Sequence, residues 1–454
     1  MTRVLLISTY EQGHQPLGLA AAAAALRRSG HEVRCLDLAV ESPGVGVFAD
    51  TDLIAISVPM HTAARLGVAL AKQLRPLYPA AHLSLYGLYA SELHAHLTAS
   101  GDVDSVIGGE YEIGLCALAD SLARGRHRCI SRLPGIGPDP AFDRQRYPLP
   151  DRSGLPPLDR YAQLETESEL RLAGYVEASR GCAHRCRHCP LTPTYGGRLR
   201  LVQPEVVLAD IDNLVRIGAQ HITLGDPDLF NAVGHSLGIL EAMHGRYPAL
   251  TFDATIKVEH LLQHAPLLPR LRELGCVFIT SAFESLDDAL LSLLDKGHTA
   301  ADLVRVLALA QRSSLVIRPT WLPFTPWTSL RDFRAILEFI EAHDLVYHVQ
   351  PVQYALRLLL PSGSPLVDVI RADGLLTGFD ADGLTHLWRN PDPSVDSLQE
   401  RLVAIVASGA QEDEAWTFAR VKAETLATIG CVEPPGPPPA GRRRVPRLTE
   451  AWFC

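Results

Sequence analysis

The sequence has few lysines, no long apolar run and no excess of basic residues. Lysine occurs only four times among 454 residues, and the formal net charge is −9. A general nucleic-acid-binding protein normally carries a basic excess, so that class is disfavoured. The longest apolar run, residues 17–26, is too short and too rich in alanine to span a bilayer, and the first residues lack the apolar core and cleavage site of a signal peptide. We therefore expect a cytoplasmic protein that binds neither nucleic acid nor membrane.

The composition is otherwise that of a globular protein with more than one domain. Hydrophobic residues make up 47% of the chain and charged residues 20%, which is ordinary for such proteins. A chain of 454 residues is long enough for two or three domains. Because arginine supplies nearly all of the positive charge, Lys257 and Lys296 stand out as candidates for specific roles.

Three cysteines lie close together in the segment Cys182-Ala-His-Arg-Cys186-Arg-His-Cys189. Three thiolates at this spacing can hold three irons of a [4Fe–4S] cluster and leave the fourth iron open to a small molecule. A zinc site needs a fourth ligand, which His184 or His188 could supply, but no second cysteine pair follows nearby. A disulfide is disfavoured in a chain without a secretory signal. The spacing therefore favours an iron–sulfur cluster.

This CxxxCxxC motif, followed by repeated strand–helix units, resembles the radical SAM superfamily. The resemblance implies that S-adenosylmethionine (SAM) binds the open iron and that an electron from the cluster cleaves SAM to a 5′-deoxyadenosyl radical, which abstracts hydrogen from a substrate. It also implies a reductant of the flavodoxin or ferredoxin type. One departure is His188, which replaces the aromatic residue that usually lies near the SAM adenine.

Strand and helix patterns divide the chain into five parts and predict an α/β fold. Residues 1–130 predict a Rossmann-like parallel sheet, of the type that binds cobalamin in the resembling family. Residues 131–170 predict a linker, and residues 171–365 a partial (β/α)6 TIM-like barrel with its site at the C-terminal face. Residues 366–430 predict a helical region, and residues 431–454 a flexible Pro/Gly-rich tail. The expected barrel strands are 175–180, 220–225, 250–256, 276–281, 315–321 and 346–354.

The loop after the second barrel strand carries Gly225, Asp226 and Asp228. The corresponding loop of radical SAM enzymes binds the amino group of SAM, so the resemblance implies this role here. An acidic side chain at a strand end suits an ammonium group. The same Gly-Asp-Pro sequence is also typical of an ordinary turn, and both interpretations stay open.

The third and fourth strands end in further charged residues. Thr255, Lys257 and Glu259 alternate, so they are expected on one face of a strand, where the lysine and glutamate would contact SAM or form a structural ion pair. Glu284 and Ser285 stand where the superfamily keeps a polar residue for the SAM ribose hydroxyls. Ser285 could equally cap the following helix.

Two cations remain to be assigned. Arg318 on the fifth strand could pair with the SAM carboxylate. Lys296 closes a predicted helix, so a capping role at that helix C-terminus is expected at least as much as a substrate role.

Short segments of the first domain resemble the cobalamin-binding domain of one radical SAM class, which includes B12-dependent methyltransferases. Glycines at strand ends let a backbone approach a bulky ligand. The D-x-H-x-x-G sequence whose histidine ligates cobalt is absent, since His14 is followed by Gly18 at the wrong spacing. The resemblance therefore implies cobalamin without a histidine lower ligand, or a domain that has lost this cofactor. The segments are 16–20, 30–33, 57–62, 86–90 and 107–112.

The last residues, Arg447-Leu-Thr-Glu-Ala-Trp-Phe-Cys454, resemble a subgroup of B12-type radical SAM proteins. In that subgroup the tail continues with selenocysteine or cysteine and then Ala-Glu-Pro, so the resemblance implies a longer natural chain. The alternative is an ordinary disordered end.

Together the patterns predict a radical SAM enzyme that uses a [4Fe–4S] cluster, SAM and cobalamin for radical C-methylation of an unknown small molecule or peptide. One alternative is a rearranging or peptide-modifying radical SAM enzyme without cobalamin. Another is a non-catalytic iron–sulfur sensor or electron carrier. A methylthiotransferase is disfavoured, because Cys35, Cys116 and Cys129 do not form a convincing second cluster site.

Overall fold

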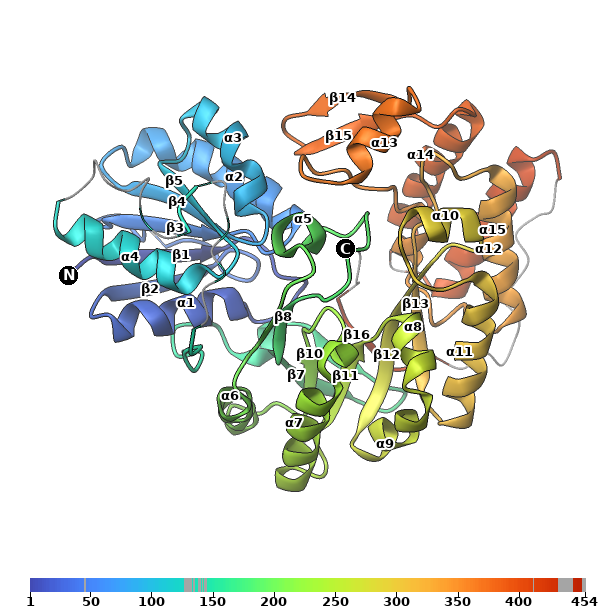
Figure 1. Ribbon diagram of the computed structural model, residues 1–454, viewed down its shortest axis with the longest axis horizontal. Helices are drawn as coiled ribbons and strands as arrows, with labels where there is room; N and C mark the ends of the chain where they lie inside the picture. The colour runs from blue at the N-terminus through green and yellow to red at the C-terminus, as the bar shows by residue number, and fades with distance from the viewer. Residues whose placement is uncertain are drawn as a thin grey trace.

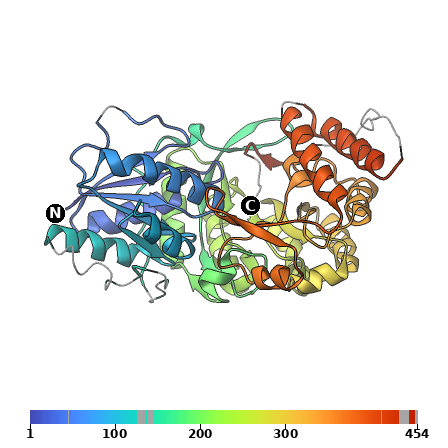
Figure 2. The ribbon, with the colours of Figure 1, turned by 90° about the horizontal axis from the view of Figure 1, so that it is seen from above.

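The computed structural model describes residues 1–44, 46–125, 133, 135–137, 140, 142, 145–410, 412–431 and 444–450. Two sheets lie side by side, the first built from the N-terminal part of the chain and the second from its middle (Figure 1). The C-terminal helices pack at the far side of the second sheet, as the view from above confirms (Figure 2). Within the described ranges, no helix has the length and apolar character needed to cross a membrane.

The first sheet is a Rossmann-like parallel sheet in the order β2-β1-β3-β4-β5. The strands are β1 (Arg3–Ser8), β2 (Glu32–Asp37), β3 (Leu53–Ser57), β4 (His82–Gly87) and β5 (Ser105–Gly108), and the helices are α1 (Leu17–Arg28), α2 (His61–Leu77), α3 (Ala90–Ser100) and α4 (Tyr111–Ala123). Every residue of β3 is buried, because helices cover both faces of a parallel sheet of this kind. Each strand predicted for this domain is present.

The second sheet is a curved partial barrel in the order β13-β12-β11-β10-β7-β6-β16. Its parallel strands are β7 (Leu170–Val176), β10 (His221–Leu224), β11 (Thr251–Thr255), β12 (Cys276–Glu284) and β13 (Val316–Trp321). Its helices are α6 (Pro204–Arg216), α7 (Val233–Arg246), α8 (Val258–Gln263), α9 (Leu268–Glu273), α10 (Asp288–Leu293), α11 (Ala300–Arg312) and α12 (Leu330–Ala342). The short β6 (Gln163–Glu165) joins the edge of β7 in antiparallel pairing. The predicted combination of a Rossmann-like sheet and a partial barrel is confirmed.

The strand predicted at residues 346–354 is wrong. That part of the chain forms the 3₁₀ helix η5 (Pro351–Ala355). In place of a sixth barrel strand there is a single β-bridge between Phe324 and Arg357. Proline lacks the N–H that a sheet ladder requires, so Pro351 favours the helical turn over a strand.

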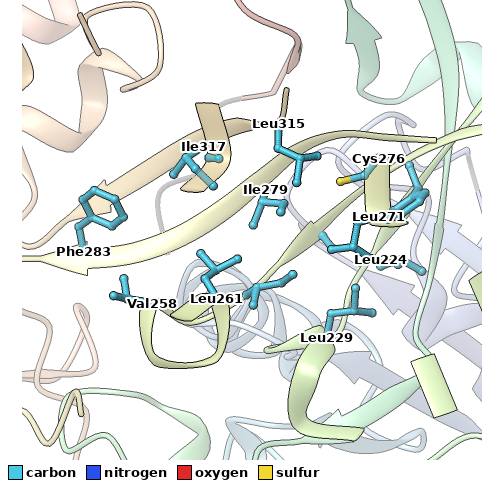
Figure 3. Close-up of a cluster of buried hydrophobic side chains, with 14 of the residues drawn as sticks. Leu224, Leu229, Val258, Leu261, Leu271, Cys276, Ile279, Phe283, Leu315 and Ile317 are labelled. Atoms are coloured by element: carbon cyan, nitrogen blue, oxygen red, sulfur yellow. The ribbon is translucent and has the colours of Figure 1, made fainter. Parts of the chain in front are cut away.

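The two faces of the barrel sheet differ in polarity. One row of paired residues contains Leu224, Ala254, Ile279 and Ile317, all of which belong to the largest hydrophobic core. Figure 3 shows three of these side chains, Leu224, Ile279 and Ile317, in a cluster with Leu261 and Phe283, among others. Because neighbouring residues along a strand point to opposite faces, the polar residues between them face the other side of the sheet. That face carries the candidate functional groups.

The C-terminal region is helical apart from one hairpin that the sequence did not predict. Its elements are α13 (Leu366–Ala372), β14 (Leu376–Asp380), β15 (Thr385–Trp388), α14 (Pro393–Ser408) and α15 (Glu414–Thr428). Leu384 in the hairpin turn packs into the core of the first domain. The hairpin therefore connects the C-terminal region to the Rossmann-like sheet.

Part of the predicted tail is docked. Strand β16 (Arg447–Leu448) pairs with β6 in antiparallel fashion. Arg447 forms ion pairs with Glu165 and Glu414, and the Tyr10 hydroxyl lies 2.5 Å from Glu450 Oε1. Residues 444–450 therefore lie between the barrel and the first domain, whereas Cys454 is outside the described residues.

Candidate functional site

The three cysteines lie in one loop between β8 (Ser179–Gly181) and α5 (Leu191–Tyr195). The amide of Asn231 donates to Cys182 Sγ at 3.4 Å, and the Thr192 hydroxyl donates to the Cys186 carbonyl at 2.8 Å. The Arg187 N–H donates to the Leu294 carbonyl at 3.0 Å. The loop is thus held by the ends of several barrel elements.

All three cysteines are free thiols. Burial raises the pKa of Cys189 to about 12 and also raises the pKa of Cys182. The three thiols lie within electrostatic reach of one another. Thiolates are the form that binds iron, and metal binding releases their protons. A loop with three clustered, unpaired thiols and no disulfide fits a [4Fe–4S] cluster.

The loop begins at a glycine that no other residue could replace without strain. Gly181 has φ = +72°, and a Cβ there would overlap the Tyr195 ring and the Arg198 carbonyl oxygen. Only glycine adopts this left-handed backbone without a steric cost. It lets the chain turn tightly from β8 into the cysteine loop.

Glu284 ties the fourth barrel strand to the cysteine loop. Its Oε1 lies 3.1 Å from both the Lys296 ammonium and His188 Nε2. Burial by itself would raise the pKa of Glu284, but Lys296 and His188 outweigh it and hold that pKa well below the ordinary range. The Lys296 side chain therefore pairs with this carboxylate and does not cap a helix. Glu284 also has φ = +64°, a strained backbone of the kind often found at functional sites.

Ser285 is buried beside Glu284. Its hydroxyl accepts the Asp287 N–H at 3.0 Å, and Asp287 itself caps α10 by accepting the Ala289 N–H. The N-cap role that the sequence allowed for Ser285 thus belongs to Asp287.

The two aspartates of the loop after β10, Asp226 and Asp228, contact different parts of the structure. Asp226 accepts hydrogen bonds from the Ala178 N–H at 2.9 Å and the Ser179 hydroxyl at 2.5 Å, and burial raises its pKa to about 6. Gly225 packs so closely that a Cβ would overlap the Tyr175 hydroxyl. Asp226 and Gly225 therefore hold the loop against β7 and β8.

Asp228, Lys257 and Glu259 gather around His184, a residue of the cysteine loop. Lys257 Nζ lies 3.0 Å from His184 Nδ1 and 3.2 Å from Glu259 Oε2, so the predicted lysine–glutamate ion pair is present. The expectation that Thr255, Lys257 and Glu259 share a strand face is wrong, because β11 ends at Thr255 and α8 begins at Val258. The tertiary fold also brings His260 into this group.

Arg318 lies apart from the contacts that surround the cysteine loop. Its Nη1 donates to the Pro446 carbonyl at 3.3 Å, and its guanidinium lies over the Phe278 ring at 5.8 Å. Burial lowers its pKa to about 10, and Nη2 has no hydrogen-bond partner. Arg318 therefore faces the docked segment 444–450.

The first domain contacts β8 and α5, the two elements that flank the cysteine loop, and no pattern in the sequence predicts this contact. The Tyr195 hydroxyl donates to Glu110 at 2.9 Å, and the Thr194 hydroxyl donates to the Leu88 carbonyl at 3.1 Å. Partly buried Arg180 adds an ion pair to Glu110 at 3.2 Å. Leu88 and Glu110 follow β4 and β5, so the C-terminal edge of the Rossmann-like sheet abuts α5, just after Cys189.

Comparison with known proteins identifies the middle of the chain. Residues 176–339 match the family model described as the radical SAM superfamily. Hopanoid C-3 methylase from Methylococcus capsulatus is 28% identical over 326 residues, covering 68% of this chain and 62% of the relative. The chain thus spans less than two thirds of that relative's length. The ribosomal protein uS12 methylthiotransferase RimO from Thermus thermophilus is 26% identical over 325 residues, covering 65% of this chain and 73% of that protein.

The fold extends this similarity to nearly the whole chain. The structure of the cobalamin-dependent SAM radical enzyme OxsB, with aqua-cobalamin and SAM bound, has a TM-score of 0.71 and 14% identity. The match covers 95% of this chain and 70% of that one, so both share the arrangement of a Rossmann-like sheet and a partial barrel. Residues 176–339 are therefore similar to the radical SAM superfamily, and nearly the whole chain shares the fold of a cobalamin-dependent SAM radical enzyme.

Proposed function

We propose that this chain is a cobalamin-assisted radical SAM methylase that transfers a methyl group to carbon. The observation that carries the proposal is the contact between the C-terminal edge of the Rossmann-like sheet and α5, the helix that follows the cysteine loop, through Tyr195 and Glu110. Ligands of open α/β sheets bind at this edge, and barrel sites lie at the C-terminal ends of barrel strands. A cofactor on the first sheet would thus adjoin the cluster.

Cys182, Cys186 and Cys189 would hold the cluster, and SAM would bind at its open iron. The residues proposed for SAM are the loop and strand-end residues Gly225, Asp226, Asp228, Lys257, Glu259, Glu284, Ser285 and Arg318. When bound, the reduced cluster would supply one electron to cleave SAM into methionine and a 5′-deoxyadenosyl radical, and this radical would become 5′-deoxyadenosine by taking a hydrogen atom from the substrate. The chain itself positions the cofactors and excludes water.

Buried polar atoms without partners support a large polar ligand on the first sheet. Glu11 Oε2, His61 Nε2, Ser91 Oγ and Glu92 Oε2 are buried and make no hydrogen bond, and all four residues follow strand ends. Such atoms need an explanation in a folded protein. Burial raises the pKa of Glu11 to about 8 and that of Glu92 to about 7, so both carboxyls can donate a proton to an acceptor. The amide groups around the cobalamin ring supply both donors and acceptors.

The proposed cobalamin would have no histidine lower ligand from His14. This side chain is buried and stacks on Tyr175 with the ring centres 4.6 Å apart. Burial lowers its pKa to about 4, so it stays neutral and serves as a packing group between the two domains.

A methylthiotransferase is the main competing function, since RimO is among the relatives. A second cluster would need three further cysteines. In the part of the chain that the structure describes, Cys35 lies on β2 and Cys116 on α4, where its sulfur accepts from Ser29; Cys129 is outside the described residues. We therefore favour C-methylation, with a flavodoxin- or ferredoxin-type reductant in the cytoplasm and a small-molecule or peptide substrate.

The test uses full-length protein purified anaerobically, reconstituted with iron and sulfide, incubated with hydroxocobalamin and freed of unbound cofactor. We expect about one cobalt and about four irons per chain, and 5′-deoxyadenosine after SAM and reductant are added. Cys186→Ala should abolish 5′-deoxyadenosine formation, whereas Cys276→Ala, a buried cysteine of β12, should not.

The other outcomes identify the competing functions. About eight irons per chain would favour a methylthiotransferase. Formation of 5′-deoxyadenosine without retained cobalt would mean a cobalamin-independent radical SAM enzyme. A reducible cluster that never cleaves SAM would favour a sensor or electron carrier.

A further inference from the structure

A compact group of two histidines and one carboxylate lies beside the cysteine loop. His184 Nε2 is 3.3 Å from His260 Nε2 and 3.7 Å from Asp228 Oδ2. His260 Nδ1 is 2.7 Å from the same carboxylate oxygen. The three residues come from the cysteine loop, the start of α8 and the loop after β10. We propose that His184, His260 and Asp228 bind a divalent transition-metal ion that is separate from the iron–sulfur cluster, a role that takes the place of SAM binding for Asp228.

The spacing of the ligand atoms fits a single ion. Two ligand atoms that each lie about 2.1 Å from one metal are separated by about 3.0 to 3.5 Å when the angle at the metal is between about 90° and 110°. With His260 Nδ1 as the ligand atom of that residue, Asp228 Oδ2 lies 2.7 Å from His260 and 3.7 Å from His184 Nε2, one separation just below this range and one just above it. One ligand atom from each residue can be chosen so that all three lie within 4.8 Å of one another. Small side-chain adjustments bring all three atoms to bonding distance.

One carboxylate oxygen of Asp228 is buried without a hydrogen-bond partner. Its Oδ1 accepts the Phe230 N–H at 3.1 Å, but its Oδ2 is fully buried and makes no hydrogen bond despite its nearness to the two imidazoles. His260 Nδ1 likewise has no hydrogen-bond partner. A buried, uncompensated carboxylate is costly. A divalent cation at this point satisfies both atoms and supplies the missing positive charge.

Lys257 does not supply that charge to Asp228, because its ammonium lies against His184 Nδ1 and Glu259 Oε2. When His184 binds an ion through Nε2, its proton resides on Nδ1. Glu259 Oε2 lies 3.9 Å from that nitrogen, so it accepts this proton only after it moves closer and the Lys257 ammonium, now 3.0 Å from the same nitrogen, moves aside. A carboxylate behind a ligating histidine is the usual support for such ligands.

The donor set defines the chemical class of the ion. Two imidazoles and one carboxylate suit iron(II), zinc and neighbouring divalent ions of the first transition row, and three protein ligands leave further coordination positions open. Calcium and magnesium prefer oxygen ligands throughout. The site uses no sulfur ligand and is therefore distinct from the three thiolates, although His184 lies on the same loop.

The test measures zinc binding to full-length protein whose cluster has been reconstituted, so that the cysteines are occupied. Equilibrium dialysis at graded zinc concentrations, with iron measured in parallel, should give about one zinc per chain without loss of iron. His260→Ala and Asp228→Asn should each weaken zinc binding at least about tenfold. His264→Ala is the matched control, because its ring lies 5.8 Å from that of His260 and outside the group.

X-ray absorption at the zinc edge tests the same site in the unmodified protein and does not depend on the folding of a variant. We expect only nitrogen and oxygen in the first coordination shell, with scattering from imidazole rings. Sulfur in that shell would place zinc on the cysteines and overturn the proposal. Stoichiometric zinc binding that His260→Ala leaves unchanged, or no zinc binding at all, would overturn it equally.

Discussion

The buried ion pair between Arg152 and Asp210 should contribute strongly to the stability of the contact between the first domain and the barrel. Arg152 donates from Nε and Nη2 to the two Asp210 oxygens, each at 2.8 Å. It also donates to Gln15 Oε1 at 2.9 Å and to the Tyr175 carbonyl at 2.7 Å. One side chain therefore joins the loop after β1, strand β7 and helix α6.

The cost of its loss follows from burial. The side chains of Arg152 and Asp210 are only 5% and 3% exposed, so Arg152→Ala leaves an isolated carboxylate inside the protein. Removal of one partner from a buried pair costs about 3 to 5 kcal/mol. Arg146 and Glu205 form the matched control, because this pair joins the same segment to α6 but is 84% and 62% exposed. Arg146→Ala should cost no more than about 1 kcal/mol.

Hydrogen exchange of the α6 amides provides the assay, since a chain of several domains need not unfold in one step. A loss of 3 kcal/mol should speed exchange by at least about 100-fold in Arg152→Ala. The double variant R152L/D210L, which removes both charges, should recover much of this protection. Exchange within about threefold of wild type in Arg152→Ala, or equal effects in Arg152→Ala and Arg146→Ala, would refute the reasoning.

Three further predictions concern single residues around the site. Gly225→Ala should lower the free energy of unfolding by about 1 to 3 kcal/mol, because the new Cβ would overlap Tyr175. Gly234→Ala on α7, where the Cβ would meet no other atom, should raise it by up to about 1 kcal/mol. Urea unfolding measures both changes. The raised pKa of Asp226, about 6, means that the folded state binds the proton more tightly. The free energy of unfolding should therefore be about 3 kcal/mol lower above pH 6 than below pH 4. The Asp226→Asn variant should not show this decrease. Arg447→Ala loses two ion pairs and should speed hydrogen exchange in β6 and β16 without affecting β12.

The repeating core of both sheets could be predicted from the sequence. Buried parallel strands are apolar on both faces or alternate strongly, as in residues 3–8 and 53–57, and helices follow them at regular spacing. Shorter elements carried no such signal. Strand β16 has two residues and β6 three, and their pairing joins positions nearly 300 residues apart, a distance over which no local pattern acts.

The candidate site was predictable only where its residues are neighbours in the chain. Three cysteines within eight residues define their own loop. The group of His184, Asp228 and His260 is assembled from three separate elements, and a lone histidine in a helix such as α8 carries no information about its partners. Lys296 shows the same limitation: its position after α10 suggested a cap, whereas the fold places its ammonium on Glu284.

The docked segment 444–450 contacts both the barrel and the first domain. The carbonyl of Pro446 accepts from Arg318 in the barrel, and Glu450 meets Tyr10 in the loop after β1. Because Arg318 is buried and its Nη2 has no partner in the described structure, a release of this segment would leave the guanidinium free for an anionic ligand such as the SAM carboxylate. The docked segment therefore occupies Nη1 and leaves Nη2 open, and hydrogen exchange of β16 with and without SAM would reveal whether SAM binding releases the segment.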